Sequence, residues 1–307
     1  MTEREKLLEQ LEQISNLDDM QKISDKLLAL DSKDPYGLFL SWNLLGGDDN
    51  REKLEHIDLL QDTYSTMHEV IHSKEIAEPL ADRDFCLFMT IAYSLGLSFI
   101  ELGKGDEALS IARDMVHHDE ENIFNSRELL YASMIMLEMW NDILDFQMND
   151  TVECLAGLYT QALALLQSGD DESETMEAFY NAVAVAPKIP LYILGILEFD
   201  EEEEITEIFE PNLTTTIEFL TKIWTSNNKC INLLSMFAFP FAYIRGYLKD
   251  KEEINFLEKL YARFDLLDKL KTLKSQLSRS AKKGKDEKAL DEEAFLATKE
   301  LIKYIKQ

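Results

Sequence analysis

Apolar residues recur every three to four positions along this chain, and this spacing is the strongest constraint on its fold. Between residues 51 and 77 they form a single stripe, which consists of Leu54, Ile57, Leu60, Tyr64, Met67 and Ile71. Because residues three and four apart lie on one face of an α-helix, the stripe predicts an amphipathic helix packed against a neighbour. Gly (11) and Pro (6) are scarce, which disfavours an all-β fold with its many turns. The sequence therefore predicts an all-α protein.

The same spacing predicts where further helices lie. We expect helices over residues 2–16, 20–30, 36–45 and 51–77, with Pro79 closing this region, and later over 212–226, 229–248, 251–280 and 286–306. The most apolar run, Ile231 to Ile244, is too short to span a bilayer. It predicts a buried helix that is kinked or ended near Pro240.

Charge narrows the choice of partner. The chain has 31 basic and 59 acidic residues, a formal net charge of −28. Such a surface repels nucleic acid and anionic membranes, because binding to either needs Lys and Arg. We therefore expect a protein segment as the partner, such as an amphipathic or basic helix, and no nucleic acid, membrane or cofactor. Solubility alone is the other explanation of the charge.

The cysteines indicate the compartment. Cys86, Cys154 and Cys230 lie far apart with no CxxC spacing, as is typical of buried thiols in a reducing environment. The N-terminal residues are charged and amphipathic, without the apolar stretch of a secretory signal. The expected location is therefore cytoplasmic.

A repeat is visible between residues 84 and 187. Gly96 and Ala108 are small enough to let two antiparallel helices approach closely, and Gly103 would permit a tight connection between them. Gly169 marks the turn of a second copy, 66 residues after Gly103 and close to two periods of about 34. The residues that define the two copies are Leu95, Gly96, Phe99, Gly103, Ala108, Ala162, Gly169, Phe179, Ala182 and Pro187.

These residues, with Asp-Glu-Ala-Leu at 106–109, resemble the tetratricopeptide repeat, and 127–150 have the length of another helix pair. The ending formed by Pro187, Pro190, Tyr192, Leu194 and Gly195 is similar to that of divergent bacterial repeats and of the suppression-of-tumorigenicity family. The resemblance implies an α-solenoid of antiparallel helix pairs with a C-terminal helical extension. The expected regions are degenerate pairs at 1–83, repeat-like pairs at 84–198, an acidic loop at 199–211, and C-terminal helices at 212–307 with a basic stretch at 263–288.

The resemblance also implies a binding surface, because tetratricopeptide stacks bind ligands along the first helix of each pair. The matching positions are Tyr93, Leu97, Ile100, Glu128, Ala132, Ile135, Tyr159, Leu163 and Leu166. Either an amphipathic helix of a partner lies on this apolar surface, or the chain's own C-terminal helices cover it. The leading hypothesis is a non-enzymatic adaptor or scaffold. A structural subunit of an obligate oligomer or complex is an alternative.

A different class of function is indicated by residues 68–72, which read HExxH. On a helix, His68 and His72 share one face and can bind Zn²⁺, while Glu69 can act as the general base. This is similar to the signature of zincin metallopeptidases, so a zinc-dependent hydrolase is an alternative. A third ligand would be a downstream carboxylate, namely Glu75, Glu78 or Glu101.

The surroundings of the HExxH motif depart from the zincin pattern. Lys74 stands where a hydrophobic residue is usual, and the sequence contains no strand to line a cleft. The favoured interpretation places His68 and His72 at the edge of a helix–helix contact, without a metal. His117 and His118 are adjacent, so on a helix they point about 100° apart and cannot chelate together. We expect them to interact favourably with the dipole at a helix C-terminus.

Overall fold

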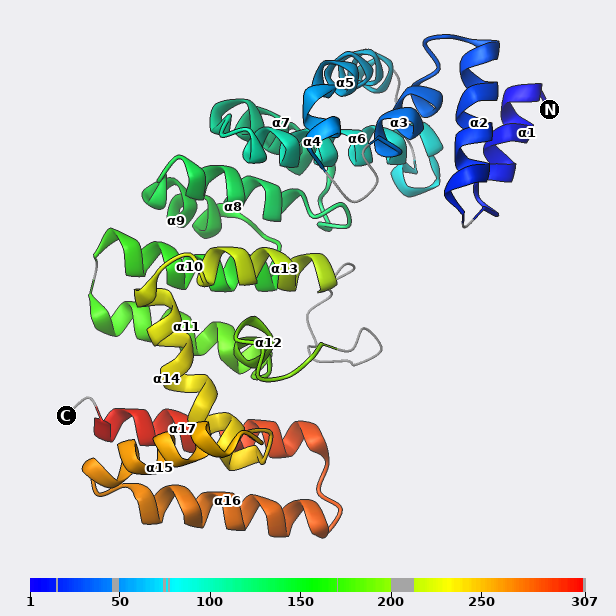
Figure 1. Ribbon diagram of the computed structural model, residues 1–307. Coiled ribbons are helices and arrows are strands. Elements are labelled where there is room, and N and C mark those ends of the chain that lie inside the picture. Colours follow the sequence, from blue (N-terminus) through cyan, green and yellow to red (C-terminus); the bar gives the residue numbers. More distant parts are fainter. Residues whose placement is uncertain are drawn as a thin grey trace. The chain divides into compact units, whose positions relative to one another are not determined.

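The computed structural model describes residues 1–14, 16–45, 50–73, 76, 78–169, 171–199 and 213–305 (Figure 1). Within these ranges the chain forms 17 α-helices and one short 3₁₀ helix, with no strand. The prediction of an all-α fold is confirmed. The chain divides into two compact units, Met1–Leu137 and Glu138–Gln307. Of the predicted acidic loop at 199–211, Phe199 alone belongs to the described residues.

Unit 1 is a succession of helices in which each packs against its neighbours in the sequence. Contacts join α1 to α2, α2 to α3, α3 to α5, α5 to α6, α6 to α7 and α7 to α8, and α6 also contacts α8. This is the arrangement of a helical repeat fold. The elements are α1 (Glu3–Leu11), α2 (Leu17–Leu30), α3 (Pro35–Asn43), α4 (Asn50–Glu55), α5 (Ile57–His72), η1 (Pro79–Ala81), α6 (Arg83–Glu101), α7 (Gly105–His118) and α8 (Ser126–Met136).

Side-chain caps set the starts of four of these helices. Thr2, Asn16, Asp34 and Asp82 each accept a hydrogen bond from a backbone N–H of the first turn, which has no partner within the helix. The prediction of a single helix over 51–77 is wrong, because the helix is interrupted at His56, between α4 and α5. By length and composition α6 could cross a membrane, but 61% of its apolar window is buried. That burial is expected of the core helix of unit 1.

Gly103 and the buried repeat residues of unit 1 lie at the turn and in the core, as the sequence predicted. Gly103 has φ of 72°, and it allows the Lys104 N–H to donate to the Phe99 carbonyl (2.8 Å), which closes the end of α6. Leu95, Phe99 and Ala108 are buried. These residues stabilise the turn and the α6–α7 contact.

Gly96 makes room for a helix other than the one expected. A Cβ built on Gly96 would lie 2.4 Å from Leu129 Cδ2 of α8. The glycine therefore permits the approach of the first helices of two successive pairs, α6 and α8. Sequence reasoning had placed the close approach within one pair, between α6 and α7.

We expect Gly96→Val to lower the free energy of unfolding by about 2 kcal/mol, because it overpacks the contact with Leu129. Urea denaturation followed by circular dichroism measures the change. In the double variant Gly96→Val/Leu129→Ala, the added methyl groups enter the space that Leu129 leaves. The double variant should therefore lose less free energy of unfolding than the two single variants lose together. Strictly additive losses would show that Gly96 and Leu129 are not in contact.

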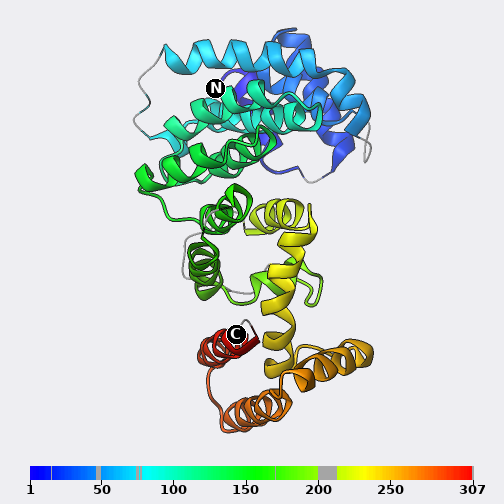
Figure 2. The same cartoon turned by 90° about the vertical axis from the view of Figure 1, so that its left-hand side faces the viewer.

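Unit 2 begins with repeat-like pairs and ends in a group of longer helices. Contacts join α9 to α10, α10 to α11 and α13, α12 to α13 and α14, and α14 to α15, α16 and α17. Figure 2 shows α14 (yellow) leading to the three C-terminal helices. The elements are α9 (Trp140–Asn149), α10 (Leu155–Ser168), α11 (Glu172–Val185), α12 (Ile189–Ile193), α13 (Leu213–Trp224), α14 (Asn228–Arg245), α15 (Lys251–Arg263), α16 (Leu267–Lys282) and α17 (Glu287–Ile305).

Unit 2 follows the sequence pattern with one correction. Gly169 has φ of 77° at the end of α10, as a turn glycine should, and Ala162, Phe179 and Ala182 are fully buried. Pro187 is half-buried just after α11. The helix predicted over 251–280 is two helices, α15 and α16, with a left-handed Asp265 (φ of 58°) between them. Pro240 lies inside α14 and does not end it.

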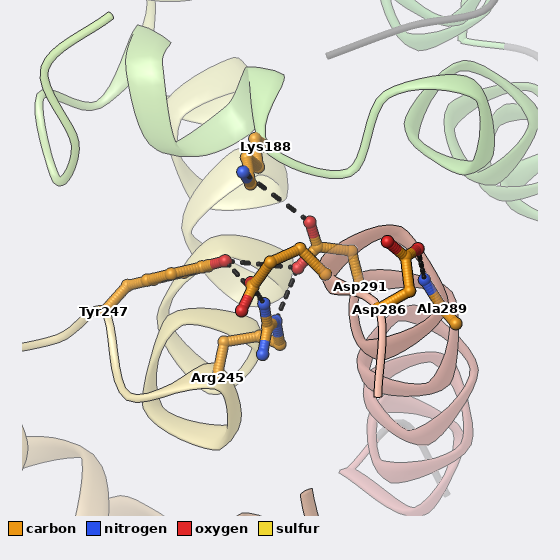
Figure 3. Close-up of polar contacts among 7 residues, drawn as sticks. Lys188, Arg245, Tyr247, Asp286, Ala289 and Asp291 are labelled. Carbon is orange, nitrogen blue, oxygen red and sulfur yellow. Dashed lines mark hydrogen bonds and ion pairs between the residues drawn. The ribbon is translucent and has the colours of Figure 1, made fainter. Parts of the chain in front are cut away.

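A buried polar network joins α14 to α17 in unit 2 (Figure 3). Arg245 Nε donates to Asp291 Oδ1 at 2.5 Å, and the same guanidinium donates to the Tyr247 hydroxyl at 2.7 Å and to Glu287. Lys188, just before α12, places its Nζ 3.8 Å from Asp291 Oδ2. The Arg245 side chain is only 4% exposed, so these acceptors compensate for the water that it has lost.

Candidate functional site

The predicted groove residues of unit 1 are partly accessible. On α6, Leu97 is 39% exposed and Tyr93 and Ile100 are half-buried. On the adjacent α8, Ala132 and Ile135 are half-buried. The ends of these two helices add Leu102 and Met136, which are 40% and 36% exposed. We call these seven residues the α6–α8 strip.

Glu128 departs from the prediction that it lines the groove. It is 1% exposed, and its Oε2 accepts a hydrogen bond from Asn122 Nδ2 at 3.0 Å. The carboxylate therefore orders the loop before α8 and cannot reach a partner. The sequence motif specified its helix position but not the loop that folds over it.

In unit 2 the corresponding residues are largely covered by the chain itself. Tyr159 and Leu163 are 0% and 2% exposed, and Leu166 is half-buried. The ring of Tyr159 lies 5.9 Å from that of Trp224, which α13 contributes. At Tyr159 and Leu163 the arrangement is therefore the second of the two predicted alternatives, in which the chain's own C-terminal helices cover the surface, because α13 packs on α10.

The HExxH histidines lie on the accessible face of α5. His68 and His72 stack with ring centroids 3.9 Å apart, and their side chains are 40% and 39% exposed. The buried ring of Phe88 from α6 lies against both, with centroids 6.1 and 6.4 Å away. This is the edge of a helix–helix contact that the sequence predicted.

Two side chains of α7 join these histidines. Asp114 Oδ2 lies 3.7 Å from His68 Nε2, and its Oδ1 lies 3.7 Å from His72 Nε2. His118 Nε2 lies 3.4 Å from His72 Nε2 and 3.9 Å from Asp114 Oδ1. The ligand atoms of His68, His72 and Asp114 all lie within 4.8 Å of one another. We call His68, His72, Asp114 and His118 the histidine cluster.

One imidazole of the histidine cluster has its tautomer set by a hydrogen bond, and two neighbouring groups have shifted pKa values. His72 Nδ1 lies 3.0 Å from the His68 carbonyl, which can only accept, so Nδ1 carries the hydrogen and Nε2 is free to accept. Burial lowers the pKa of His118, as do the neighbouring histidines, while Asp114 opposes this shift. Burial, with the nearby Asp114, raises the pKa of Tyr64, which stays protonated and donates to Asp114 Oδ2 at 3.1 Å.

Sequence reasoning identified two members of this cluster and missed the other two. Glu69, Glu78 and Glu101 are exposed and do not belong to the group of converging ligand atoms. Glu75 lies outside the described residues. A usable signal was present, because Asp114 and His118 repeat the i, i+4 spacing of His68 and His72. The sequence analysis considered His118 only together with its neighbour His117.

A pocket of about 660 Å³ opens beside the histidine cluster in unit 1. Its wall includes His72 and His118, with apolar side chains such as Phe85 and Phe124. The Asp119 carboxylate, which also faces it, accepts the backbone N–H groups of residues 123 and 124 at 2.7 and 3.0 Å. These bonds hold the loop after α7 in place, so this side of the pocket is ordered before any ligand arrives.

The chain was compared with protein-family models, with curated proteins and with solved structures. None of the three comparisons found a match. The fold class therefore rests on the observed helix packing. The chain is an all-α protein whose helices pack in neighbouring pairs.

Proposed function

We propose that this protein is a non-enzymatic adaptor that binds an amphipathic, basic helix of another protein along the α6–α8 strip. The observation that supports the proposal most directly is the exposure of Leu97 in the last third of α6. Leu97 lies between half-buried Tyr93 and Ile100 at helical spacing. Partly exposed apolar side chains gathered on two adjacent helices are typical of a surface that a partner covers.

The charge of the chain favours a basic partner. At −28 the protein attracts cationic segments over long range and repels anionic ones. An amphipathic helix with Lys or Arg beside its apolar face would bury Leu97 while its charged face meets the negative field. Recognition of this kind uses side-chain packing and needs no cofactor.

We expect Leu97→Glu to weaken partner binding at least about 10-fold, because a buried contact is replaced by a charge. The assay uses the full chain with a photoreactive amino acid at position 97, cross-linked to a library of helical peptides that vary in charge and hydrophobicity. The same group at Ser110, which is exposed on α7, should capture far less. Recovered peptides should be basic and amphipathic, and their affinity is then measured by fluorescence anisotropy.

Leu296→Glu is the matched control variant. Leu296 is 60% exposed on α17, and the change adds the same charge to the protein. It should leave peptide affinity and stability unchanged within about 0.5 kcal/mol. Equal capture at positions 97 and 110, or equal loss in both Glu variants, would contradict the proposal. Cross-linking of position 97 to a second copy of the chain would instead identify an oligomer interface.

A further inference from the structure

We propose that the histidine cluster binds one divalent transition-metal ion, Zn²⁺ above all, and thereby joins α5 to α7 in unit 1. The ligands are Nε2 of His68, His72 and His118 and the carboxylate of Asp114. This site goes beyond the adaptor function and does not depend on it. It also differs from the predicted zincin site, which would use a downstream glutamate and a catalytic Glu69.

The spacing of the four side chains suits a tetrahedral ion. With metal–ligand distances of about 2.0–2.1 Å, the ligand atoms of a tetrahedral zinc site lie about 3.3 Å apart. The separations from Asp114 to the three imidazoles, and between His118 Nε2 and His72 Nε2, lie between 3.4 and 3.9 Å, and the ligand atoms of His68, His72 and Asp114 lie within 4.8 Å of one another. Coordination would require side-chain rotations that bring these atoms closer together around the ion.

The chemistry of the donors selects the type of metal. Three imidazoles and one carboxylate suit Zn²⁺ and the related ions Co²⁺, Ni²⁺ and Cu²⁺, whereas Mg²⁺ and Ca²⁺ prefer oxygen ligands throughout. A carboxylate with three neutral imidazoles leaves the occupied site with one net positive charge. That charge is favourable in a protein whose formal charge is −28.

The side chains around the cluster act as the outer shell of a metal site. A histidine that binds a metal usually donates its other ring N–H to a carbonyl or carboxylate, and His72 Nδ1 does so to the His68 carbonyl at 3.0 Å. Tyr64 donates to Asp114 Oδ2 and fixes the orientation of that carboxylate. Phe88 supplies an apolar floor, with its ring 6.1 to 6.4 Å from the three imidazoles. The outer shell is thus present in the folded chain.

Four protein ligands favour a structural role over a catalytic one. A tetrahedral ion that is held by three histidines and Asp114 has no open position for water or substrate. The ion would instead connect the C-terminal ends of α5 and α7, where His72 and His118 face the 660 Å³ pocket. Metal binding would therefore stiffen one wall of that pocket.

The test is titration of the metal-free full chain with Co²⁺ and then Zn²⁺. We expect one Co²⁺ per chain, with the intense visible absorption of a tetrahedral site, and its displacement by one equivalent of Zn²⁺. In His68→Ala/His72→Ala the affinity should fall by more than about 100-fold, since loss of even an outer-shell partner costs 10- to 100-fold. Asp114→Asn, which keeps the shape of the side chain, should also weaken binding strongly.

The remaining two of the five histidines provide a matched control. His56 and His117 are exposed and lie outside the cluster, so His56→Ala/His117→Ala removes the same number of imidazoles. This control should bind Co²⁺ and Zn²⁺ as the parent chain does, and Zn²⁺ should raise its Tm equally. Circular dichroism without metal verifies that each variant is folded.

Three results would overturn the inference. They are no stoichiometric Co²⁺ or Zn²⁺ binding by the parent chain, affinity that survives in His68→Ala/His72→Ala, or affinity that is lost in the His56/His117 control. Weak, octahedral-type Co²⁺ absorption would contradict the four-ligand site. None of these results depends on peptide binding to the α6–α8 strip, so this inference and the proposed function fail separately.

Discussion

Replacing Asp291 with alanine is expected to lower the free energy of unfolding by about 3–5 kcal/mol, because it leaves a buried guanidinium without its main acceptor. Arg245 is 4% exposed, and its Nε donates to Asp291 at 2.5 Å. Tyr247 shares the same carboxylate oxygen at 3.3 Å, and Lys188 approaches the other. One substitution therefore removes contacts to the residue before α12, to α14 and to the turn after α14. Urea denaturation followed by circular dichroism measures the loss.

Glu287→Ala is the control for the Asp291 variant. Glu287 also accepts from Arg245, but its side chain is 70% exposed, so water replaces it at a cost within about 1 kcal/mol. The double variant Arg245→Met/Asp291→Leu removes both charges and should be more stable than Asp291→Ala alone. Equal losses for Asp291→Ala and Glu287→Ala would show that burial does not control the strength of this network.

Replacing Trp224 with alanine is expected to cost about 3–5 kcal/mol, as is typical of a large aromatic removed from a core. Trp224 is fully buried, with its ring 5.9 Å from that of Tyr159 and 5.7 Å from that of Phe179. The variant loses the contacts that hold α13 on α10 and α11. Hydrogen exchange should therefore accelerate in α13 and α10, and the midpoint of urea denaturation should fall.

Trp140→Ala is the matched comparison, because Trp140 is half-buried at the start of α9. Trp140→Ala should lower the free energy of unfolding clearly less than Trp224→Ala does. If α13 opens in the Trp224 variant, Tyr159 and Leu163 become accessible, and binding of an apolar dye should increase. A loss below about 1 kcal/mol with unchanged exchange in α10 would mean that Trp224 does not hold α13 in place.

Local patterns were sufficient to predict the helical class and the repeat turns. Gly103 and Gly169 have positive φ at helix ends, where the sequence placed turns, because a glycine at that position lowers the cost of a left-handed residue. The breaks at His56 and Asp265 were missed, since neither residue is a strong helix breaker and the apolar stripe continues across them. Helix boundaries of this kind depend on how the neighbouring helices pack.

The candidate sites also contain some residues that the sequence identified and others that only the folded chain brought together. His68 and His72 were identifiable because a single helix sets their spacing. Asp114 and His118 joined them only through the packing of α5 and α7 on α6, over a distance of about 40 residues in the chain. Likewise the sequence placed Leu97 and Leu163 at equivalent repeat positions, yet Leu97 is 39% exposed in unit 1 and Leu163 is 2% exposed in unit 2, where α13 packs on α10.

The sequence by itself determined the helical spacing, the turn glycines and the pairing of His68 with His72 on a single helix, because each depends on residues within a few positions of one another. It also determined the acidic charge, which follows from composition. Tertiary structure alone decided which predicted groove residues are open, which carboxylate faces the HExxH histidines, and how Arg245 is compensated. These features depend on contacts between segments far apart in the chain, and no local pattern specifies which distant side chain fills a given space.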